Sequence, residues 1–526
     1  ALRQPLENGS VSISRVNAHT VYPARFQLIA AMNPCRCGNL GNPALACSRA
    51  PKCAEEYQSR ISGPLLDRID IHIEVPAVSP WEMNDVKKGE SSAAIRERVI
   101  KAREIQAERF RRMGHLELNT NSQLRGDMLE AALTAGLCSV GADVESLGVV
   151  PTPAVAYLVR KYNADAGVVI SASHNPMEFN GIKIFAGTGY KLPDDLEERI
   201  ESLILGEAAL PPLPADCDLG TVSYAPNALR DYIDHVKSTV HFSLTGLEIA
   251  LDCANGSSAM TAETLFTELG AKVHMLHDEP NGTNINDNCG STHMESLVEY
   301  VKTHKVDAGI AFDGDADRCL TVDEQGCVID GDKMMAICAA EMEKKGRLHG
   351  GGFVATVMSN IGLHKYCAEH GLRLLCASVG DRNVLELMQK EGMRLGGEQS
   401  GHIIFLDYMP TGDGQLAALQ FLDILSHSGK KASELSASVR QYPQLLQNVR
   451  VTSNEQKTAI MQSDSLREAI QKAEAELGEN GRVLIRPSGT EPLIRVMVEA
   501  GTEQQAQAVT QALVQHVENL QKSSEK

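Results

Sequence analysis

Short apolar runs rich in β-branched residues alternate with amphipathic stretches from about residue 125 onward. The runs lie at 168–170, 247–254, 308–312, 352–358 and 374–379, and each precedes a turn and a helix-like segment. Alternation of this kind is typical of βαβ units built on parallel strands. We therefore expect an α/β fold made of several α/β/α domains with mixed sheets.

The pattern before residue 125 is different. Residues 11–15 and 26–32 are predicted to form two strands, separated by a turn at Pro23. Residues 91–112 carry apolar side chains at helical spacing among many charges, which indicates an exposed helix. The polar segment 119–123 contains few helix-forming residues and is a candidate linker. The sequence pattern therefore changes at about residue 125.

The C-terminal end has a third pattern. Strand-like runs at 483–485 and 493–500 are followed by a long helix-like stretch. Two neighbouring strands with a covering helix predict a small α+β domain rather than another βαβ unit. The chain has 526 residues, which is enough for several domains of ordinary size.

Composition narrows the class of protein. The chain has no run of 18 or more apolar residues and no secretory signal pattern, so we expect neither a membrane span nor export. Its 13 cysteines are an odd number, which favours reduced thiols and a cytoplasmic location. The net charge is −18, although Lys and Arg outnumber Asp and Glu before residue 125. We expect no nucleic-acid binding by the acidic body of the chain.

The first loop that carries chemistry is Ser171–Pro176, directly after the run at 168–170. Open α/β sheets bind ligands at the carboxyl ends of their strands, and Asn175 and Pro176 favour a turn that exposes the hydroxyl of Ser173. A turn with a capping serine would have the same sequence, so this loop alone does not decide between the two interpretations.

The second loop contains Asp313, Asp315 and Asp317 between two apolar runs. Three carboxylates at alternate positions of a tight loop repel one another unless a hard cation joins them. The glycine and closing glutamate of an EF-hand are absent at the required spacing. The sequence favours a metal site over a solvated acidic loop, and such an ion would stabilise a phosphoryl group during transfer.

Two further loops are rich in glycine and hydroxyl groups. In the segment 396–402, Glu398 and Ser400 could hold sugar hydroxyls, although an ordinary glycine-rich turn has the same composition. In the segment 486–492, a guanidinium beside hydroxyls and free backbone N–H groups forms a candidate phosphate site, with a capped turn as the alternative. The residues of this fourth loop and the strand after it are Arg486, Ser488, Gly489, Thr490 and Arg495.

The four loops occur in the order found in the α-D-phosphohexomutase family, and the chain resembles that family over 125–526. The segments Asn286–His293 and Ser378–Arg382 strengthen the resemblance. The sequence Gly-Glu-Gln-Ser-Gly-His at 397–402 is similar to that of members acting on glucosamine phosphates, with glucose and mannose phosphates as alternatives.

The resemblance implies a role for each loop. Ser173 matches the family's phosphoserine, and one of its phosphate oxygens would complete a Mg²⁺ site with the three aspartates. Glu398 and Ser400 match the sugar-binding loop, and the fourth loop matches the site for the phosphate that does not react. The remaining catalytic positions are His174 in the serine loop, Lys183 and His402 for proton transfer, and Arg318 beside the metal.

The resemblance also implies the reaction. The phosphoserine gives its phosphate to glucosamine 6-phosphate, which forms glucosamine 1,6-bisphosphate. The intermediate then returns its other phosphate to Ser173 and leaves as glucosamine 1-phosphate, a precursor for cell-wall synthesis. The expected cofactors are Mg²⁺ and the bisphosphate as activator, and the expected partner is a small sugar phosphate.

The front of the chain departs from the family. The resemblance starts near Arg125, so the opening strands of the first domain and an arginine-bearing loop are missing, and we expect an unstable first domain and impaired activity. Residues 1–124 instead resemble part of a magnesium-chelatase-like AAA+ ATPase of the competence-protein type. The matching segments are 2–9, Ala30–Cys35 and Arg60–Asp70.

Two alternatives to an active mutase follow from that front segment. An inactive fusion would retain ligand binding without turnover. A nucleotide-dependent remodelling module is less favoured, because the chain contains no phosphate-loop motif of the type GxxxxGK[ST]. Cys35, Cys37, Cys47 and Cys53 could bind zinc, although their spacing is looser than in a two-knuckle site and reduced loop thiols are the alternative.

The predicted division of the chain combines these observations. The N-terminal part is the partial AAA+ fragment, and the four mutase domains in order carry the phosphoserine, metal, sugar and phosphate loops. The predicted bounds are 1–124, 125–240, 241–345, 346–445 and 446–526.

Overall fold

The computed structural model describes most of the chain after residue 125 and shorter parts before it. The described residues are 10–15, 18–23, 26, 28–33, 57, 91–112, 126–205, 214, 218–488 and 493–524. The predicted linker at 119–123 and the candidate zinc ligands Cys35, Cys37, Cys47 and Cys53 lie outside them. Among the described helices, none is both long and apolar enough to cross a bilayer.

The described N-terminal residues form a hairpin and one long helix. Strands β1 (Ser10–Arg15) and β2 (Ala18–Pro23) pair antiparallel, and α4 (Ser92–Arg112) coincides with the predicted exposed helix. The strand predicted at 26–32 is wrong, because the described residues there have no regular structure and Ile29 is 86% exposed. The second strand instead comes earlier and ends at Pro23, which cannot donate a backbone hydrogen bond.

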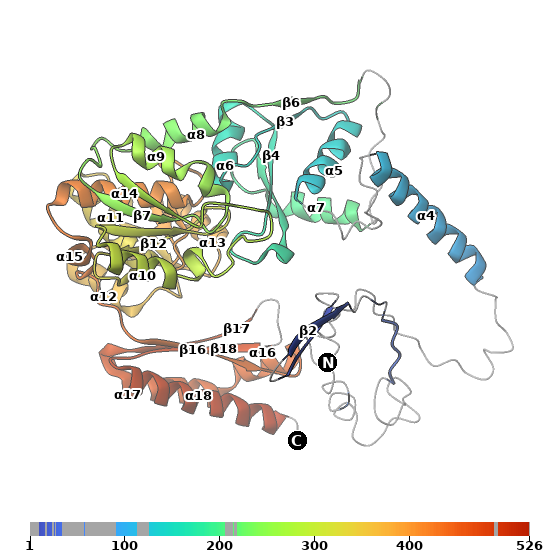
Figure 1. Cartoon of the computed structure of the whole chain (residues 1–526). Coiled ribbons are helices and arrows are strands. Elements are labelled where there is room, and N and C mark those ends of the chain that lie inside the picture. The colour runs from blue at the N-terminus through green and yellow to red at the C-terminus, as the bar shows by residue number, and fades with distance from the viewer. Residues whose placement is uncertain are drawn as a thin grey trace.

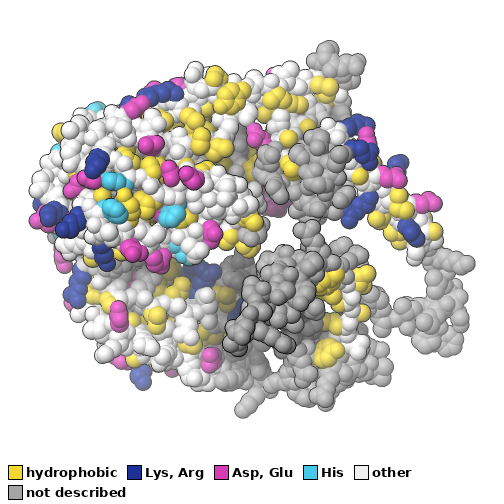
Figure 2. Space-filling model, viewed as in Figure 1, with side chains coloured by type: hydrophobic (Ala, Val, Ile, Leu, Met, Phe, Trp, Pro, Cys, Tyr) yellow, Lys and Arg dark blue, Asp and Glu magenta, His cyan; other side chains and the backbone are white. Residues whose placement is uncertain are grey.

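The first α/β unit contains two small sheets instead of one. Strands β3 and β6 pair parallel, and β4 and β5 pair antiparallel. Tyr224 on β6 is 62% exposed, and Figure 2 shows apolar side chains gathered on the surface around β6, α6 and α8. The elements of this unit are α5 (Gly126–Ser139), β3 (Val144–Ser146), α6 (Thr152–Lys161), β4 (Ala166–Ser171), β5 (Gly181–Ala186), α7 (Asp194–Ile204), β6 (Val222–Tyr224) and α8 (Ala228–Lys237).

The second unit has a five-stranded mixed sheet in the order β11-β10-β9-β7-β8. All residues of β9 are buried, as expected for a central strand with both faces covered. The elements are β7 (Glu248–Asp252), α9 (Ala262–Glu268), β8 (Lys272–Leu276), α10 (Glu295–His304), β9 (Ala308–Phe312), β10 (Cys319–Asp323) and β11 (Val328–Ile329).

The third unit has a four-stranded sheet in the order β13-β12-β14-β15, and three of its helices begin with a side-chain cap. Asp330, Asn360 and Asp413 each accept a backbone N–H at a helix start. The elements are α11 (Gly331–Lys344), β12 (Gly352–Thr356), α12 (Ile361–His370), β13 (Arg373–Ala377), α13 (Asp381–Glu391), β14 (Leu395–Gly397), β15 (Ile403–Phe405), α14 (Gly414–Ser428) and α15 (Ala432–Ser436).

The C-terminal unit has the predicted α+β form, with its own hydrophobic core. Its antiparallel sheet has the order β16-β18-β17, and Figure 1 shows it as a separate layer beneath the α/β units. The elements are β16 (Gln444–Arg450), α16 (Asn454–Gln462), α17 (Asp464–Leu477), β17 (Arg482–Pro487), β18 (Leu493–Glu499) and α18 (Glu503–Ser524).

A single hydrophobic core continues through all three α/β units. It includes Phe185 of the first unit, Phe266 of the second and Phe421 of the third, all fully buried. The expectation that each apolar run precedes a helix is wrong for β4 and β9. These two strands lead into the antiparallel strands β5 and β10, so the serine and aspartate loops are hairpin connections.

Candidate active site

The aspartate loop connects β9 to β10 and is buried. Asp313 is 0% exposed, Asp315 2% and Asp317 8%, and their ligand atoms lie within 4.8 Å of one another. Within the described part of the chain, one oxygen of each carboxylate is buried without a hydrogen-bond partner, namely Oδ2 of Asp313, Oδ1 of Asp315 and Oδ1 of Asp317. Converging carboxylate oxygens of this kind fit a hard divalent cation.

The charges around this loop are strongly coupled. Burial raises the pKa of Asp313, and the charges of Asp317 and Asp315 raise it further. Burial opposes the charge of Lys183, but Asp317 and Asp315 outweigh burial and raise the pKa of this ammonium group. Lys183 on β5 donates hydrogen bonds to Asp315 and, at 3.2 Å, to Asp317. A cation at this loop would relieve the repulsion between the carboxylates.

The serine loop lies against the aspartate loop. An added Cβ at Gly314 would lie 2.6 Å from the carbonyl oxygen of Ser173, so only glycine allows this approach. Thr152 at the start of α6 also links the two units, because its Oγ1 donates to Asp315 Oδ2 at 2.8 Å. Burial and the charge of Arg318 lower the pKa of His174. Ser173 therefore lies beside the candidate metal site.

The third unit contributes His402, which is 3% exposed. Its Nδ1 lies 3.7 Å from Asp317 Oδ2 and its Nε2 lies 3.9 Å from Asp381 Oδ2. Burial opposes protonation of His402, but Asp317 and Asp381 raise its pKa above the ordinary value. The Nε of Arg318 lies 3.8 Å from the other carboxylate oxygen of Asp317, Oδ1. The predicted proton-transfer residues Lys183 and His402 therefore both contact the aspartate loop.

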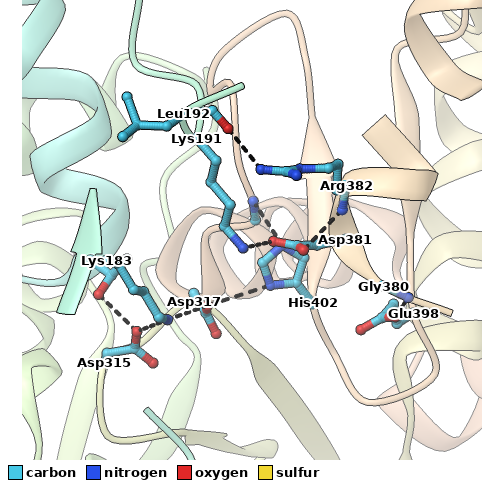
Figure 3. A network of polar contacts seen from close by, with 12 residues as sticks. Lys183, Lys191, Leu192, Asp315, Asp317, Gly380, Asp381, Arg382, Glu398 and His402 are labelled. Atoms are coloured by element: carbon cyan, nitrogen blue, oxygen red, sulfur yellow. Dashed lines mark hydrogen bonds and ion pairs between the residues drawn. The ribbon is translucent and has the colours of Figure 1, made fainter. Parts of the chain in front are cut away.

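The sugar loop is next to this network (Figure 3). Glu398 Oε1 accepts the backbone N–H of Gly380 at 3.0 Å, and Ser400 Oγ donates to Glu398 Oε2 at 3.4 Å. Glu398 follows β14, and Ser400 is exposed. The loop thus presents a carboxylate and a hydroxyl beside His402.

Residues without a role assigned from sequence complete the network (Figure 3). Lys191 donates to Asp381, and Arg382 donates to the carbonyl oxygen of Leu192 at 2.7 Å. These contacts join the segment after β5 to the start of α13. In the sequence, the segment Ser378–Arg382 has the pattern of a polar turn after a strand. Its partners Lys191 and Leu192 precede it by 190 positions, so the sequence pattern alone does not reveal them.

The predicted phosphate loop lies in the C-terminal unit. Arg486 and Arg495 are cross-strand neighbours on β17 and β18, and burial together with Arg495 lowers the pKa of Arg486. Ser488 is 4% exposed, and its carbonyl oxygen accepts from Lys457 at 2.7 Å. Two adjacent guanidinium groups favour an anion between them. Gly489 and Thr490 lie outside the described residues.

A second group of potential metal ligands consists of Asp252, His277 and Cys289. Both oxygens of Asp252 already accept backbone N–H groups, from Ala254 at 2.9 Å and Gly290 at 3.0 Å. His277 Nδ1 lies 3.0 Å from Asp252 Oδ2. Asp252 therefore serves to hold two neighbouring turns together.

Sequence families match most of the α/β and C-terminal units. Residues 120–210, 230–326, 330–442 and 446–516 match the family phosphoglucomutase/phosphomannomutase, as its alpha/beta/alpha domains I, II and III and its C-terminal domain. Residues 1–83 match magnesium chelatase, subunit ChlI. Both predicted resemblances are confirmed, whereas the predicted domain bounds, including the extension of the front fragment to residue 124, stay predictions.

Individual proteins agree with these families. The phosphoglucosamine mutase of Thermoanaerobacter sp. (strain X514) is 55% identical over 379 residues, which are 72% of this chain and 84% of that protein. A phosphoglucomutase/phosphomannomutase family protein from Burkholderia thailandensis has a TM-score of 0.62 at 21% identity and covers 75% of this chain and 86% of its own. The Aspergillus fumigatus N-acetylphosphoglucosamine mutase in complex with GlcNAc-6P and magnesium has a TM-score of 0.51 at 18% identity, over 70% of this chain and 92% of its own.

Proposed function

This chain belongs to the phosphoglucosamine mutases, isomerases of the phosphohexomutase family, and we propose that it moves phosphate on glucosamine phosphates through Ser173. The observation that carries the proposal is the convergence of Ser173, three buried aspartates, Lys183 and His402 at one place. Phosphoryl transfer needs positioning and charge neutralisation more than covalent chemistry, and this arrangement supplies both.

The proposed reaction has two matched steps. In the first, a sugar hydroxyl oxygen bonds to the phosphorus of phosphorylated Ser173, the bond from phosphorus to Oγ breaks, and the hydroxyl proton passes to a protein base. In the second, Oγ takes the other phosphate of glucosamine 1,6-bisphosphate and the sugar oxygen leaves with a proton. The bisphosphate is thus both the intermediate and the compound that loads the serine.

Each side chain has a proposed part in these steps. Lys183 is predicted to assist proton transfer, and because Asp317 and Asp315 raise its pKa, its charged form also suits charge neutralisation at the transferring group. His402 holds a proton more readily than an ordinary histidine, so it suits proton exchange with the sugar hydroxyl. Arg318 adds positive charge at the same place, and His174 lies next to Ser173.

The aspartates are proposed to bind Mg²⁺ through their three buried oxygens, together with an oxygen of the phosphoserine. A bound magnesium ion would supply positive charge that stabilises the transferring phosphoryl group. Glu398 and Ser400 are proposed to bind the sugar, and Arg486, Ser488, Gly489, Thr490 and Arg495 to bind the phosphate that does not react. The GlcNAc-6P and magnesium named for the Aspergillus fumigatus protein support a metal ion and a sugar phosphate as the ligands.

The test is an assay of the purified whole chain with glucosamine 6-phosphate, Mg²⁺ and a trace of bisphosphate, followed by ³¹P NMR. We expect glucosamine 1-phosphate to form, and glucose and mannose phosphates to react more slowly. Binding of the sugar phosphate without turnover would support the alternative of an inactive fusion, which the divided sheet of the first unit favours. Faster conversion of mannose or glucose phosphate would contradict the proposed substrate.

A further inference from the structure

The hydrogen bonds inside the serine loop account for only part of its backbone conformation. Ser173 has φ 55°, a left-handed conformation that costs free energy for any residue other than glycine. Inside the loop, Ser171 Oγ accepts the N–H of Ser173 at 2.9 Å, and the N–H of Asn175 donates to the carbonyl oxygen of Ala172 at 3.0 Å. Neither bond holds the carbonyl groups of Ser173 and Asn175.

Those two carbonyl groups are held from the second unit by Asn286. Its Nδ2 donates to the carbonyl oxygens of Ser173 and Asn175, at 2.8 Å each. Asn286 is 6% exposed, so these bonds are largely shielded from water. Because both partners are carbonyl oxygens, the group between them has to donate two hydrogen bonds, which the N–H₂ group of asparagine does and a carboxylate oxygen cannot.

The backbone at Asn286 is itself held in place. Its backbone N–H donates to the carbonyl oxygen of Ala254 at 2.9 Å. Asp252, at the end of β7, accepts the N–H groups of Ala254 and Gly290 on either side of this segment. The position of Asn286 is therefore set by the five-stranded sheet of the second unit.

The aspartate loop completes the arrangement. An added Cβ at Gly314 would lie 2.6 Å from the carbonyl oxygen of Ser173 and 2.5 Å from Cδ1 of Ile285, the residue before Asn286. The serine loop, the aspartate loop and the segment around Asn286 are therefore packed against one another. The Asn286 amide therefore links the carbonyl groups of the serine loop to the unit that carries the aspartate loop.

We propose that Asn286 is a positioning residue for phosphoryl transfer, which holds the left-handed backbone of Ser173 in register with the aspartate loop of the neighbouring unit. This inference rests on the proposed function of Ser173. The serine oxygen is the leaving group in one step and the nucleophile in the other. Both steps therefore need it at the same position relative to the aspartate loop. A displacement of about 1 Å costs about 10²-fold in rate for such aligned reactions.

Two variants of the whole chain test the proposal. Asn286→Asp has the same shape but places a carboxylate oxygen at the position of Nδ2, against both carbonyl groups. Asn286→Gly removes the side chain, and glycine adopts the native φ of 56° without strain. In both, we expect kcat per mole of phosphorylated enzyme to fall about 10²-fold, with KM for glucosamine 6-phosphate changed by less than about threefold.

Asn288 provides the matched control. It has φ 54°, is exposed, and its Nδ2 donates only to the neighbouring Asp287 in the described structure. Asn288→Asp therefore makes the same chemical change, two positions away, without touching the serine loop. We expect its kcat to equal that of the unchanged chain.

A second measurement separates positioning from folding. Loading of Ser173 by glucosamine 1,6-bisphosphate is followed by intact mass over time, and only folded molecules bind the sugar phosphate. Slow loading by folded Asn286→Gly supports the proposal, and loading at the unchanged rate would overturn it. Ser173→Ala separates the role of Ser173 from the role of Asn286. If Ser173→Ala retains turnover, the proposed function fails. If Ser173→Ala is inactive but both Asn286 variants have normal kcat, only the positioning role of Asn286 is overturned.

Discussion

Strands β4 and β9 each lead into a loop of the site, but they are supported in different ways. All residues of β9 are buried between two neighbouring strands. Strand β4 pairs with β5 alone among the described strands, and only two of its residues, Gly167 and Val169, are buried. The aspartate loop is thus held by its own sheet, whereas the serine loop depends on contacts from other units.

The contacts that support the first unit come from two sides. Asn286 of the second unit holds the carbonyl groups of the serine loop, and Lys183 donates to Asp315. Asp381 and Arg382 of the third unit hold the segment after β5. These hydrogen bonds and ion pairs from the second and third units therefore hold the catalytic loop of a unit whose own sheet is divided.

The largest expected effect is that of Ser173→Ala, which removes the proposed phosphate carrier from the less supported loop. We expect turnover to fall at least about 10⁴-fold, because the serine oxygen forms or breaks a bond to phosphorus in both proposed steps. Turnover is measured by ³¹P NMR and the phosphate on the chain by intact mass. Retained turnover would show that the phosphate takes another route.

The aspartate loop should respond to metal removal and to pH. We expect chelation to stop turnover and Asp313→Asn to lower it about 10³-fold, since several kcal/mol of charge stabilisation are lost. Burial and the neighbouring aspartates raise the pKa of Asp313, so a proton competes with the metal as the pH falls. The apparent affinity for Mg²⁺, measured by calorimetry, should decrease from pH 8 to pH 5.

Two results would contradict this account of the aspartate loop. Turnover that continues in excess chelator would show that the reaction needs no metal at these carboxylates. An affinity for Mg²⁺ that rises as the pH falls would show that protons do not compete at Asp313.

A smaller effect is expected for the ion pair between Lys191 and Asp381. Both side chains are partly exposed, at 38% and 27%, so a double-mutant cycle with Lys191→Ala and Asp381→Asn should give about 1 kcal/mol or less. Hydrogen exchange should nevertheless become faster in β4 and β5, because the first unit depends on such contacts.

The pair of Lys272 and Glu248 in the second unit is the control for that cycle. Its nitrogen and oxygen lie 2.7 Å apart on side chains that are 68% and 36% exposed. Removing it should leave exchange in the five-stranded sheet unchanged. If each double-mutant cycle accelerates hydrogen exchange equally in its own unit, then β4 does not depend on contacts from other units more than β9 does.

The smallest effect is expected for deletion of residues 1–124. Figure 1 shows α4 extending away from the α/β units, and the described hairpin of β1 and β2 pairs with itself. Turnover and the thermal unfolding of the remaining chain should therefore stay the same. A large loss in either would mean that the front segment stabilises the first unit.

The sequence by itself determined the type of each unit and the residues of each loop. Apolar runs such as 308–312 predicted strands because a buried central strand needs apolar side chains on both faces. The three aspartates predicted a metal site because closely spaced carboxylates repel one another. The strand predicted at 26–32 is wrong, because a short apolar run by itself does not distinguish a strand from an irregular segment.

Only the tertiary structure decided which loops support one another. Nothing local to Asn286 indicates that its amide faces Ser173, and nothing local to Asp381 indicates that it lies between Lys191 and His402. Such pairs depend on how separate sheets pack, and packing joins residues that are far apart in the chain. Residue type and spacing therefore identified the chemical groups, whereas their alignment for phosphoryl transfer came from contacts between units.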